Sequence, residues 1–242
     1  MESIALRVLR REAGGAAPRW AAYVVPHFEE RMTVLDALFW VRHHLEPTLA
    51  FRCACRVGMC GTCGMVINGT EGLACRTLVA TVGPRVRLEP LRSLPVLRDL
   101  AVDLGPFFEQ YRRVGAAFVP ADGSQDPARI PPGSKARERI DLHRECISCG
   151  LCYSACDVVA LHPGYLGPAA LNRAYCLVAD PREGARAERL DRVATEEGLW
   201  RCHSLFSCTQ VCPKGIAPSH AIALLKRKVV RRRLLRLLPW RR

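Results

Sequence analysis

The chain has 242 residues, 49% of them hydrophobic, with 13 cysteines and a formal net charge of +13. This length allows one large domain or two small ones, each with its own core. No apolar run approaches the roughly 18 residues of a membrane-spanning helix, and the first residues lack the continuous apolar stretch of a secretory signal. We therefore expect a cytoplasmic chain that is soluble or peripheral to a membrane.

The cysteines and the uneven charge narrow the class of protein further. Thirteen cysteines in a cytoplasmic chain favour metal ligation over disulfides, and an odd number cannot pair completely. No Asp or Glu follows Glu197, whereas nine Lys or Arg lie between Lys226 and Arg242. Each thiolate-ligated cluster adds a formal charge of about −2, so the basic composition alone does not indicate nucleic acid. A zinc-bound, basic nucleic-acid-binding protein is the alternative.

The first 95 residues have the pattern of a mostly β unit. Residues 4–10 and 20–25 are strand-like. Residues 33–45 predict a helix, with Thr33 as the N-cap and Asp36 three residues later. The Asn68–Gly69 pair between two apolar runs predicts a hairpin. Strand, strand, helix, cysteine loop and hairpin follow one another in the order of a β-grasp ferredoxin.

The pattern changes near Pro95. Residues 94–114 have helical periodicity that is interrupted at Gly105–Pro106, and residues 119–133 predict a surface loop. Further helical segments, 167–180 and 219–230, surround the later cysteines. We therefore predict an α+β protein with two domains. The first is an N-terminal β-grasp [2Fe–2S] ferredoxin domain, residues 1–98. The second is an α-helical two-cluster ferredoxin domain with a basic tail, residues 99–242.

The first cysteine group has the spacing C-x4-C-x2-C-x11-C. This is the spacing of plant-type [2Fe–2S] sites, and three glycines in the loop let the backbone bend close to a cluster. A zinc site with four cysteine ligands is the alternative, because the group also contains C-x2-C. The x4 spacing, the glycines and the hairpin favour iron. The predicted [2Fe–2S] ligands are Cys55, Cys60, Cys63 and Cys75.

The second group contains the bacterial-ferredoxin spacing C-x2-C-x2-C-x3-C, which is incomplete at its second occurrence. In such runs the fourth cysteine ligates the other cluster. Applying this rule assigns a [4Fe–4S] cluster to Cys146, Cys149, Cys152 and Cys212. The remaining cluster is then left with Cys156, Cys202 and Cys208.

Leu205 stands where the fourth ligand of that last cluster would be. Leucine cannot ligate iron, and a cubane corner without a thiolate readily loses its iron. The sequence therefore predicts a [3Fe–4S] cluster of relatively high potential, because one thiolate charge is missing. The alternative is a degenerate site with Leu205 in the core. Cys53 and Cys176 fit neither spacing, and we expect them to be unligated thiols.

Several segments together resemble the iron–sulfur subunit of succinate dehydrogenase and fumarate reductase, the respiratory complex II family. They are "CRVGMCGTCGMVINGTEGLAC", "LEPLRSLPVLRDLAVD", "CISCGLCYSAC", "GYLGPAAL" and "WRCHSLFSCTQVCPKGI". The resemblance implies an electron relay between a flavoprotein subunit holding FAD and a quinone at the membrane anchor subunits. It leaves the haem content of the anchor open. It also implies a peripheral position on the cytoplasmic face of the cell membrane.

The same resemblance bears on the quinone. Family members usually have Pro where this chain has Asp157, and ubiquinone-reducing members have a Trp pair where this chain has Ala160–Leu161. We therefore favour menaquinone. His203 resembles a residue of the quinone pocket wall, and Lys226 resembles a lysine near the quinone or the anchor. The basic tail with Trp240 suits contact with a membrane surface.

No catalytic residues are predicted on this chain. The sequence contains no G-x-G-x-x-G motif for FAD, and it offers no Ser/His/Asp or paired-carboxylate site. The dicarboxylate chemistry is therefore expected on the flavoprotein partner. The alternative function is an iron–sulfur carrier subunit of another respiratory or thiol-linked reductase.

Overall fold

A computed structural model describes residues 3–12, 17–27, 30–121 and 129–237. The chain divides into two compact units. The first comprises Met1–Pro106 and Ile147–Ala155, and the second comprises Phe107–Cys146 and Cys156–Arg242. A domain boundary after residue 98 stays a prediction. The division into compact units places residues 99–106 and 147–155 with the β-rich unit.

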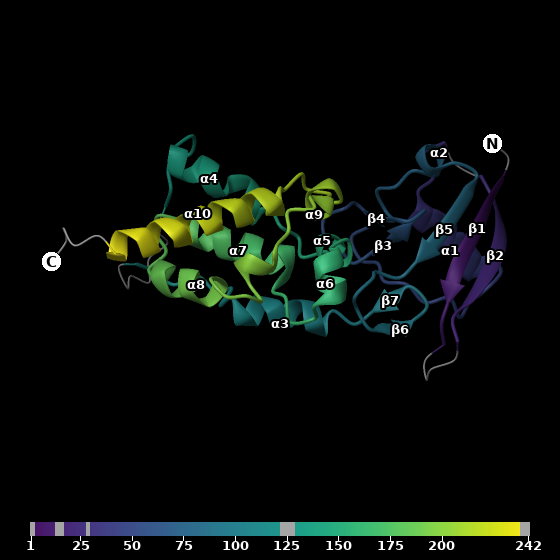
Figure 1. Cartoon of the computed structure of the whole chain (residues 1–242). Coiled ribbons are helices and arrows are strands. Elements are labelled where there is room, and N and C mark those ends of the chain that lie inside the picture. The colour runs from purple at the N-terminus through teal and green to yellow at the C-terminus, as the bar shows by residue number, and fades with distance from the viewer. Residues whose placement is uncertain (1–2, 13–16, 28–29, 122–128, 238–242) are drawn as a thin grey trace. The chain divides into compact units, whose positions relative to one another are not determined.

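The first unit contains a mixed sheet of five strands in the order β2-β1-β5-β3-β4 (Figure 1). β1 pairs in parallel with β5, and the other neighbours are antiparallel. This topology confirms the expected β-grasp arrangement. The strands are β1 Ser3–Arg10, β2 Arg19–Pro26, β3 Gly64–Ile67, β4 Thr70–Leu73 and β5 Arg85–Glu89.

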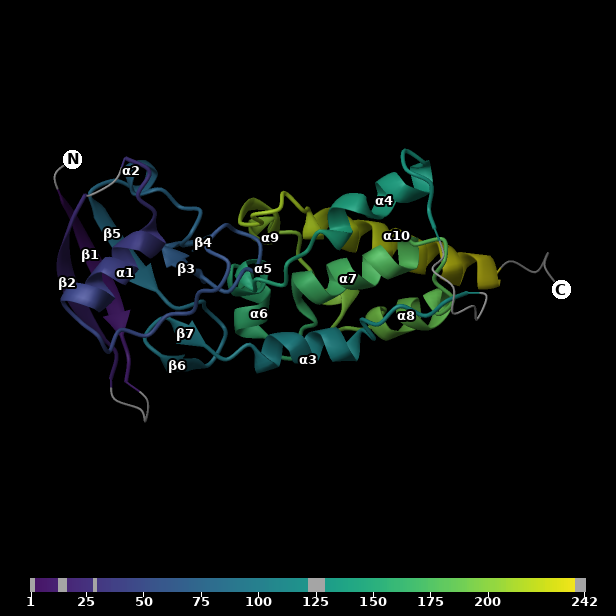
Figure 2. The same cartoon turned by 180° about the vertical axis from the view of Figure 1, so that it is seen from behind.

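Helix α1 (Val34–His44) lies against one face of this sheet (Figure 2). β1 buries alternate side chains on that face, as a half-buried strand should. The predicted N-cap is confirmed: the Thr33 hydroxyl accepts from the Asp36 N–H, and the Asp36 carboxylate accepts from the Thr33 N–H. A short helix, α2 (Val79–Val82), leads from the cysteine region into β5.

The predicted turn at Asn68–Gly69 is also confirmed. Both residues have positive φ angles, 49° and 87°, as a tight hairpin requires. The Asn68 carboxamide oxygen accepts from the Arg87 N–H at 2.7 Å, which ties the turn to β5. The hairpin brings the chain back from Cys63 to Cys75.

The helix predicted to begin at residue 94 is wrong in its first half. Residues 96–102 form a small antiparallel hairpin of β6 (Val96–Arg98) and β7 (Ala101–Val102), and α3 begins only at Gly105 (Gly105–Arg113). The cause is Asp99, which sits at the turn with φ 46°. Its buried carboxylate accepts from Arg10 Nε (2.8 Å), the Arg11 N–H (3.0 Å) and the Ala50 N–H (2.9 Å). These bonds with distant residues outweigh the local helical pattern.

The second unit is helical, as predicted, and its centre is α7 (Gly167–Ala179). Nearly every residue of α7 is buried, and the helix packs against α4, α8 and α10 (Figure 1). Leu171 and Leu177 are among its core side chains. The remaining helices of the chain are α4 Lys135–Arg144, α5 Leu151–Ser154 (in the first unit), α6 Asp157–Leu161, α8 Arg186–Val193, η1 Leu199–Arg201, α9 Ser207–Gln210 and α10 Pro218–Leu237.

Two predictions concern segments that lie partly outside the described residues. In the loop predicted over residues 119–133, Pro120 forms a bridge with Glu183, and residues 122–128 lie outside the described ranges. Trp240 of the basic tail lies outside them as well. Across the described ranges, none of the helices combines the length and the apolar character needed to cross a membrane.

Candidate iron–sulfur sites

The first cysteine loop folds around its own sulfur atoms. Cys55 Sγ accepts from the N–H groups of Met59 (3.2 Å) and Cys60 (3.3 Å). In return, Cys60 Sγ accepts from the Cys55 N–H at 3.5 Å. Two positive φ angles, at Arg56 (58°) and Gly58 (78°), turn these amides inward. Backbone donors around thiolate sulfur are what an iron–sulfur site uses to adjust its potential.

The other two thiols of this loop form a second pair. Cys63 Sγ and Cys75 Sγ lie 3.3 Å apart and are buried. Two thiolates on one tetrahedral metal are about 3.8 Å apart for a metal–sulfur bond of about 2.3 Å. The four thiols therefore gather two by two, as a two-iron cluster requires. Among the described residues, no group of three or more His, Cys, Asp or Glu side chains is placed to hold a single metal ion.

The surroundings of Cys60 and Cys63 shift the pKa values of these two thiols in opposite directions. Hydrogen bonding from the Thr62 hydroxyl, helped by the Cys55 N–H, lowers the pKa of Cys60 to about 6. Burial raises the pKa of Cys63 to about 12. A cluster bound at this site must therefore displace a proton from Cys63, because only thiolates ligate iron.

The two middle cysteines of the second motif belong to the β-rich unit. Cys149 and Cys152 lie at the start of α5, where Gly150 takes a left-handed conformation (φ 79°) before the helix. Cys146 and Cys212 belong to the helical unit, and the Tyr111 hydroxyl lies 3.7 Å from Cys146 Sγ. The members of the predicted [4Fe–4S] set are thus divided between the two compact units, and this set stays a prediction.

The three thiols of the last predicted cluster line one small pocket within the helical unit. Cys156 comes from the start of α6, whereas Cys202 and Cys208 flank the turn that precedes α9. Leu205 also lines the pocket, and 53% of its surface is exposed. It is therefore not a core residue, which counts against the alternative of a degenerate site. The pocket has three thiols and an apolar group where a fourth ligand would stand.

The turn between Cys202 and Cys208 has an unusual backbone. Ser204 (φ 57°) and Phe206 (φ 65°) are both left-handed although neither is glycine. Such conformations cost of order 1–3 kcal/mol each and persist where the surroundings impose them. They allow residues 202–208 to wrap around the pocket and hold Leu205 and Phe206 at its rim.

The two candidate quinone residues have different positions in this unit. His203 lines the three-thiol pocket directly. Lys226 on α10 donates from Nζ to the Cys202 carbonyl at 2.9 Å, so it supports the backbone of a predicted ligand. Contact of either residue with a quinone stays a prediction.

Two features of this pocket were not assigned from the sequence. Tyr165 is fully buried beside the thiols, and burial, together with the charges of Cys202 and Cys156, raises its pKa. Tyr165 lies in the segment "GYLGPAAL", which resembles the family but does not by itself indicate a role for this side chain. The hydroxyls of Thr209 and Ser219 lie 2.7 Å apart and join α9 to α10 beneath the pocket. The Cys208 thiol of the same pocket is also affected by its surroundings, because burial raises its pKa to about 11.

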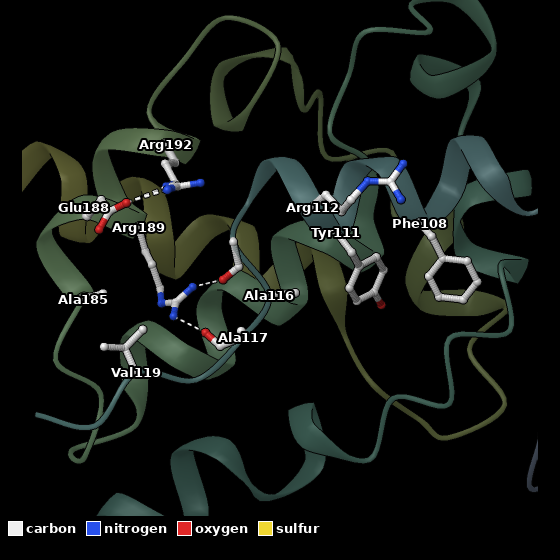
Figure 3. A pocket seen from close by; sticks show the side chains of 11 residues that line it. Phe108, Tyr111, Arg112, Ala116, Ala117, Val119, Ala185, Glu188, Arg189 and Arg192 are labelled. Carbon is white, nitrogen blue, oxygen red and sulfur yellow. Dashed lines mark hydrogen bonds and ion pairs between the residues drawn. The ribbon is translucent and has the colours of Figure 1, made fainter. Parts of the chain in front are cut away.

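A larger cavity of about 540 Å³ lies elsewhere in the helical unit, between α3 and α8 (Figure 3). Its arginines on α8 have hydrogen-bond partners: Arg192 pairs with Glu188, and Arg189 donates to the Ala117 carbonyl. Arg189 Nε, however, is buried without a hydrogen-bond partner among the described residues. None of the predicted cluster ligands lines it. Its wall at Tyr111 is nevertheless shared with the surroundings of Cys146.

Comparisons with known proteins cover both parts of the chain that carry these cysteines. A family model for the 2Fe-2S iron–sulfur cluster binding domain matches residues 5–109, and one for the 4Fe-4S dicluster domain matches residues 143–216. The chain is similar to the fumarate reductase iron–sulfur subunit of Mycobacterium tuberculosis, with 39% identity over 99% of this chain and 98% of that protein. It is also similar to a mitochondrial succinate dehydrogenase [ubiquinone] iron–sulfur subunit of Oryza sativa, with 38% identity over 80% of this chain and 70% of that protein.

A solved structure, the Mycobacterium smegmatis Sdh1 complex in the apo form, contains a chain with the same fold. The TM-score is 0.87 and the identity is 30%, over 96% of this chain and 97% of that one. The fold and the thiol sites define an iron–sulfur electron-transfer protein in which a two-iron domain precedes a dicluster domain. The chain belongs to the family of fumarate reductase and succinate dehydrogenase iron–sulfur subunits. The predicted family, α+β fold class and electron-transfer role are confirmed.

Proposed function

We propose that this chain passes electrons between a FAD-bearing flavoprotein subunit and a quinone held at membrane anchor subunits. The path would run through [2Fe–2S], [4Fe–4S] and [3Fe–4S] clusters in chain order. Each cluster, when bound, supplies a centre that takes up and releases one electron. The observation that carries the proposal is the pocket in which Cys156, Cys202 and Cys208 meet with Leu205 in the fourth position.

The residues of the chain have distinct tasks in this proposal. Cys55, Cys60, Cys63 and Cys75 would hold the two-iron cluster, and the amides of Met59 and Cys60 would stabilise charge on its sulfurs. Cys146, Cys149, Cys152 and Cys212 would hold the four-iron cluster.

At the last site, the buried Tyr165 excludes water from the thiols, and Lys226 holds the Cys202 backbone in place. The exposed Leu205 and Phe206 leave an apolar rim, which suits the approach of a quinone ring with His203 at its edge.

The finer assignments follow from the same reasoning. Dicarboxylate chemistry is placed on the flavoprotein partner, because this sequence contains no G-x-G-x-x-G motif to bind FAD. Menaquinone is favoured over ubiquinone by Asp157 and by Ala160–Leu161. The position proposed for the assembled complex is the cytoplasmic face of the cell membrane.

The proposal is tested by purifying the chain with its native partners and assaying iron and acid-labile sulfide. About nine irons per chain are expected from clusters of two, four and three irons. EPR should resolve three centres reducible by succinate, and extraction should identify the quinone as menaquinone. Two or more zinc ions per chain with little iron would overturn the proposal.

A further inference from the structure

Within the first unit, the loop of the two-iron site lies directly against the next cysteine motif. Gly61 stands between Cys60 and Cys63, and it has φ +74°. A Cβ atom added to Gly61 would lie 2.6 Å from Cys149 Cβ and 2.8 Å from Cys149 Cα. Both distances are shorter than any real contact, so the two backbones touch only because residue 61 has no side chain.

Gly58 in the same loop provides an internal comparison. Its φ of +78° makes the same backbone demand as that of Gly61. A Cβ at Gly58, however, would meet the flexible side chain of Arg76, with Cγ and Cδ both at 2.7 Å and Nε at 3.4 Å. Arg76 is exposed and its side chain can swing away, whereas the Cys149 backbone cannot. Of these two glycines, only Gly61 makes a contact between two motifs possible by its lack of a side chain.

A set of polar contacts among Ser154, Glu71 and Arg92, called the latch below, holds the second motif in this position. Ser154, at the end of α5, donates to Glu71 Oε1 on β4 at 3.0 Å and accepts from the Arg92 N–H at 2.7 Å. Arg92 Nη1 lies 3.6 Å from the same Glu71 oxygen, and Glu71 is only 6% exposed. Leu151 of α5 packs over Gly64 of the cysteine loop. The segment that carries Cys149 and Cys152 is thus anchored to the hairpin between Cys63 and Cys75.

We propose that Gly61 is the junction between the two-iron and four-iron sites, and that its contact with Cys149 sets the electronic coupling between them. This inference rests on the proposed function. In the step concerned, one electron leaves the centre held by Cys60 and enters the centre held by Cys149. The first site is oxidised by one electron and the second is reduced by one, and no bond or proton changes place. Any added atom at residue 61 lengthens the gap that this electron must cross.

The test compares Gly61→Ala with Gly58→Ala in the intact complex. Both variants carry the same backbone strain in the two-iron loop, so a shared loss of two-iron signal reports only that strain. Gly61→Ala is expected to weaken the magnetic interaction between the two reduced centres in EPR, and to slow the electron transfer between them several-fold in freeze-quench experiments. Gly58→Ala should retain the wild-type interaction per assembled cluster. Equal interaction and equal rates in the two variants would overturn the inference.

A second variant covers the case in which Gly61→Ala does not assemble. Ser154→Ala removes the latch without adding an atom, and it should weaken the same magnetic interaction relative to Thr81→Ala, which removes an exposed hydroxyl of α2. An unchanged interaction in Ser154→Ala would overturn the inference in that case. Wild-type complex that lacks the clusters, or whose clusters succinate does not reduce, would instead refute the proposed function.

Discussion

Leu205 stands where a cysteine would supply the fourth thiolate, and this missing sulfur atom is what predicts a [3Fe–4S] cluster in place of a [4Fe–4S] cluster. Replacement by Cys restores C-x2-C-x2-C-x3-C and offers a thiolate at the rim of a pocket that already holds three. We expect Leu205→Cys to gain about one iron per chain, to lose the three-iron EPR signal of the oxidised protein and to lower the potential of that site. Quinone reduction should slow, because the last centre then accepts electrons less readily.

The matched control for this change is Leu205→Ser, which removes the apolar side chain without supplying a strong iron ligand. It should keep the three-iron signal. If folded Leu205→Cys protein with a reduced thiol at residue 205 retains that signal at full strength, the residue at this position does not determine the cluster type.

Asp99, by contrast, stabilises the fold and is not a candidate cluster ligand. Its carboxylate pairs with Arg10 in the core and accepts from the Ala50 N–H just before the first cysteine loop. Removing one partner of a buried ion pair costs about 3–5 kcal/mol. Asp99→Asn should therefore lower the free energy of unfolding by roughly this amount in urea titrations, and it should destabilise the two-iron site.

The exposed pair Arg87–Glu89 on β5 is the comparison for Asp99. Solvent screens this pair, so Glu89→Gln should cost at most about 1 kcal/mol. Similar losses in the two variants would show that burial of the Asp99 pair contributes little. Asp99 was not predicted from the sequence, since its partners lie 49 to 89 residues away and the local periodicity of residues 94–104 favours a helix.

At the level of single elements, α1 depends on a local signal that can be tested alone. Thr33 and Asp36 cap its first turn reciprocally. Thr33→Ala removes the acceptor of the Asp36 N–H and should cost about 1 kcal/mol of stability. Chemical denaturation followed by circular dichroism measures this loss. Thr33→Ser keeps the hydroxyl and should stay near the wild type; an equal loss in both variants would contradict a role for the cap.

Elements with local signals were predicted well, and elements set by distant contacts were not. β1, β2, α1 and the Asn68–Gly69 turn follow from alternation, capping and turn chemistry within a few residues. The parallel pairing of β1 with β5 joins segments some 80 residues apart and leaves no local trace.

The candidate sites show the same contrast between residues with a local sequence signal and residues placed by distant contacts. Spacing alone predicted the thiols that the structure brings together in the first loop and in the three-thiol pocket. Tyr165 and Ser219 line that pocket only because α7, α9 and α10 pack together, and the Thr209 hydroxyl lies beside that of Ser219. No spacing rule relates these residues to the cysteines, so their positions could not be predicted.

For the whole molecule, the two compact units predict independent loss of clusters. The four thiols of the first site lie in one unit, and Cys156, Cys202 and Cys208 lie in the other. Cys55→Ser should remove about two of the nine irons and the two-iron EPR signal, while the three-iron signal persists. Cys53→Ser, which changes a thiol outside the spacing, should keep all three signals. Simultaneous loss of every signal in folded Cys55→Ser protein would contradict this independence.

Because residues 147–155 belong to the first unit, the ribosome must synthesise residues 107–146 before that unit can be completed. The first stretch of this unit ends at Pro106, and the segment with Cys149 follows about 40 residues later. At roughly 5–20 residues per second, the ribosome needs about 2–8 s to supply it. Throughout this interval the nascent two-iron loop lacks the contact between Gly61 and Cys149. Until residues 147–155 emerge, the thiols of this loop are therefore more open to oxygen and to other metals than they are in the folded unit.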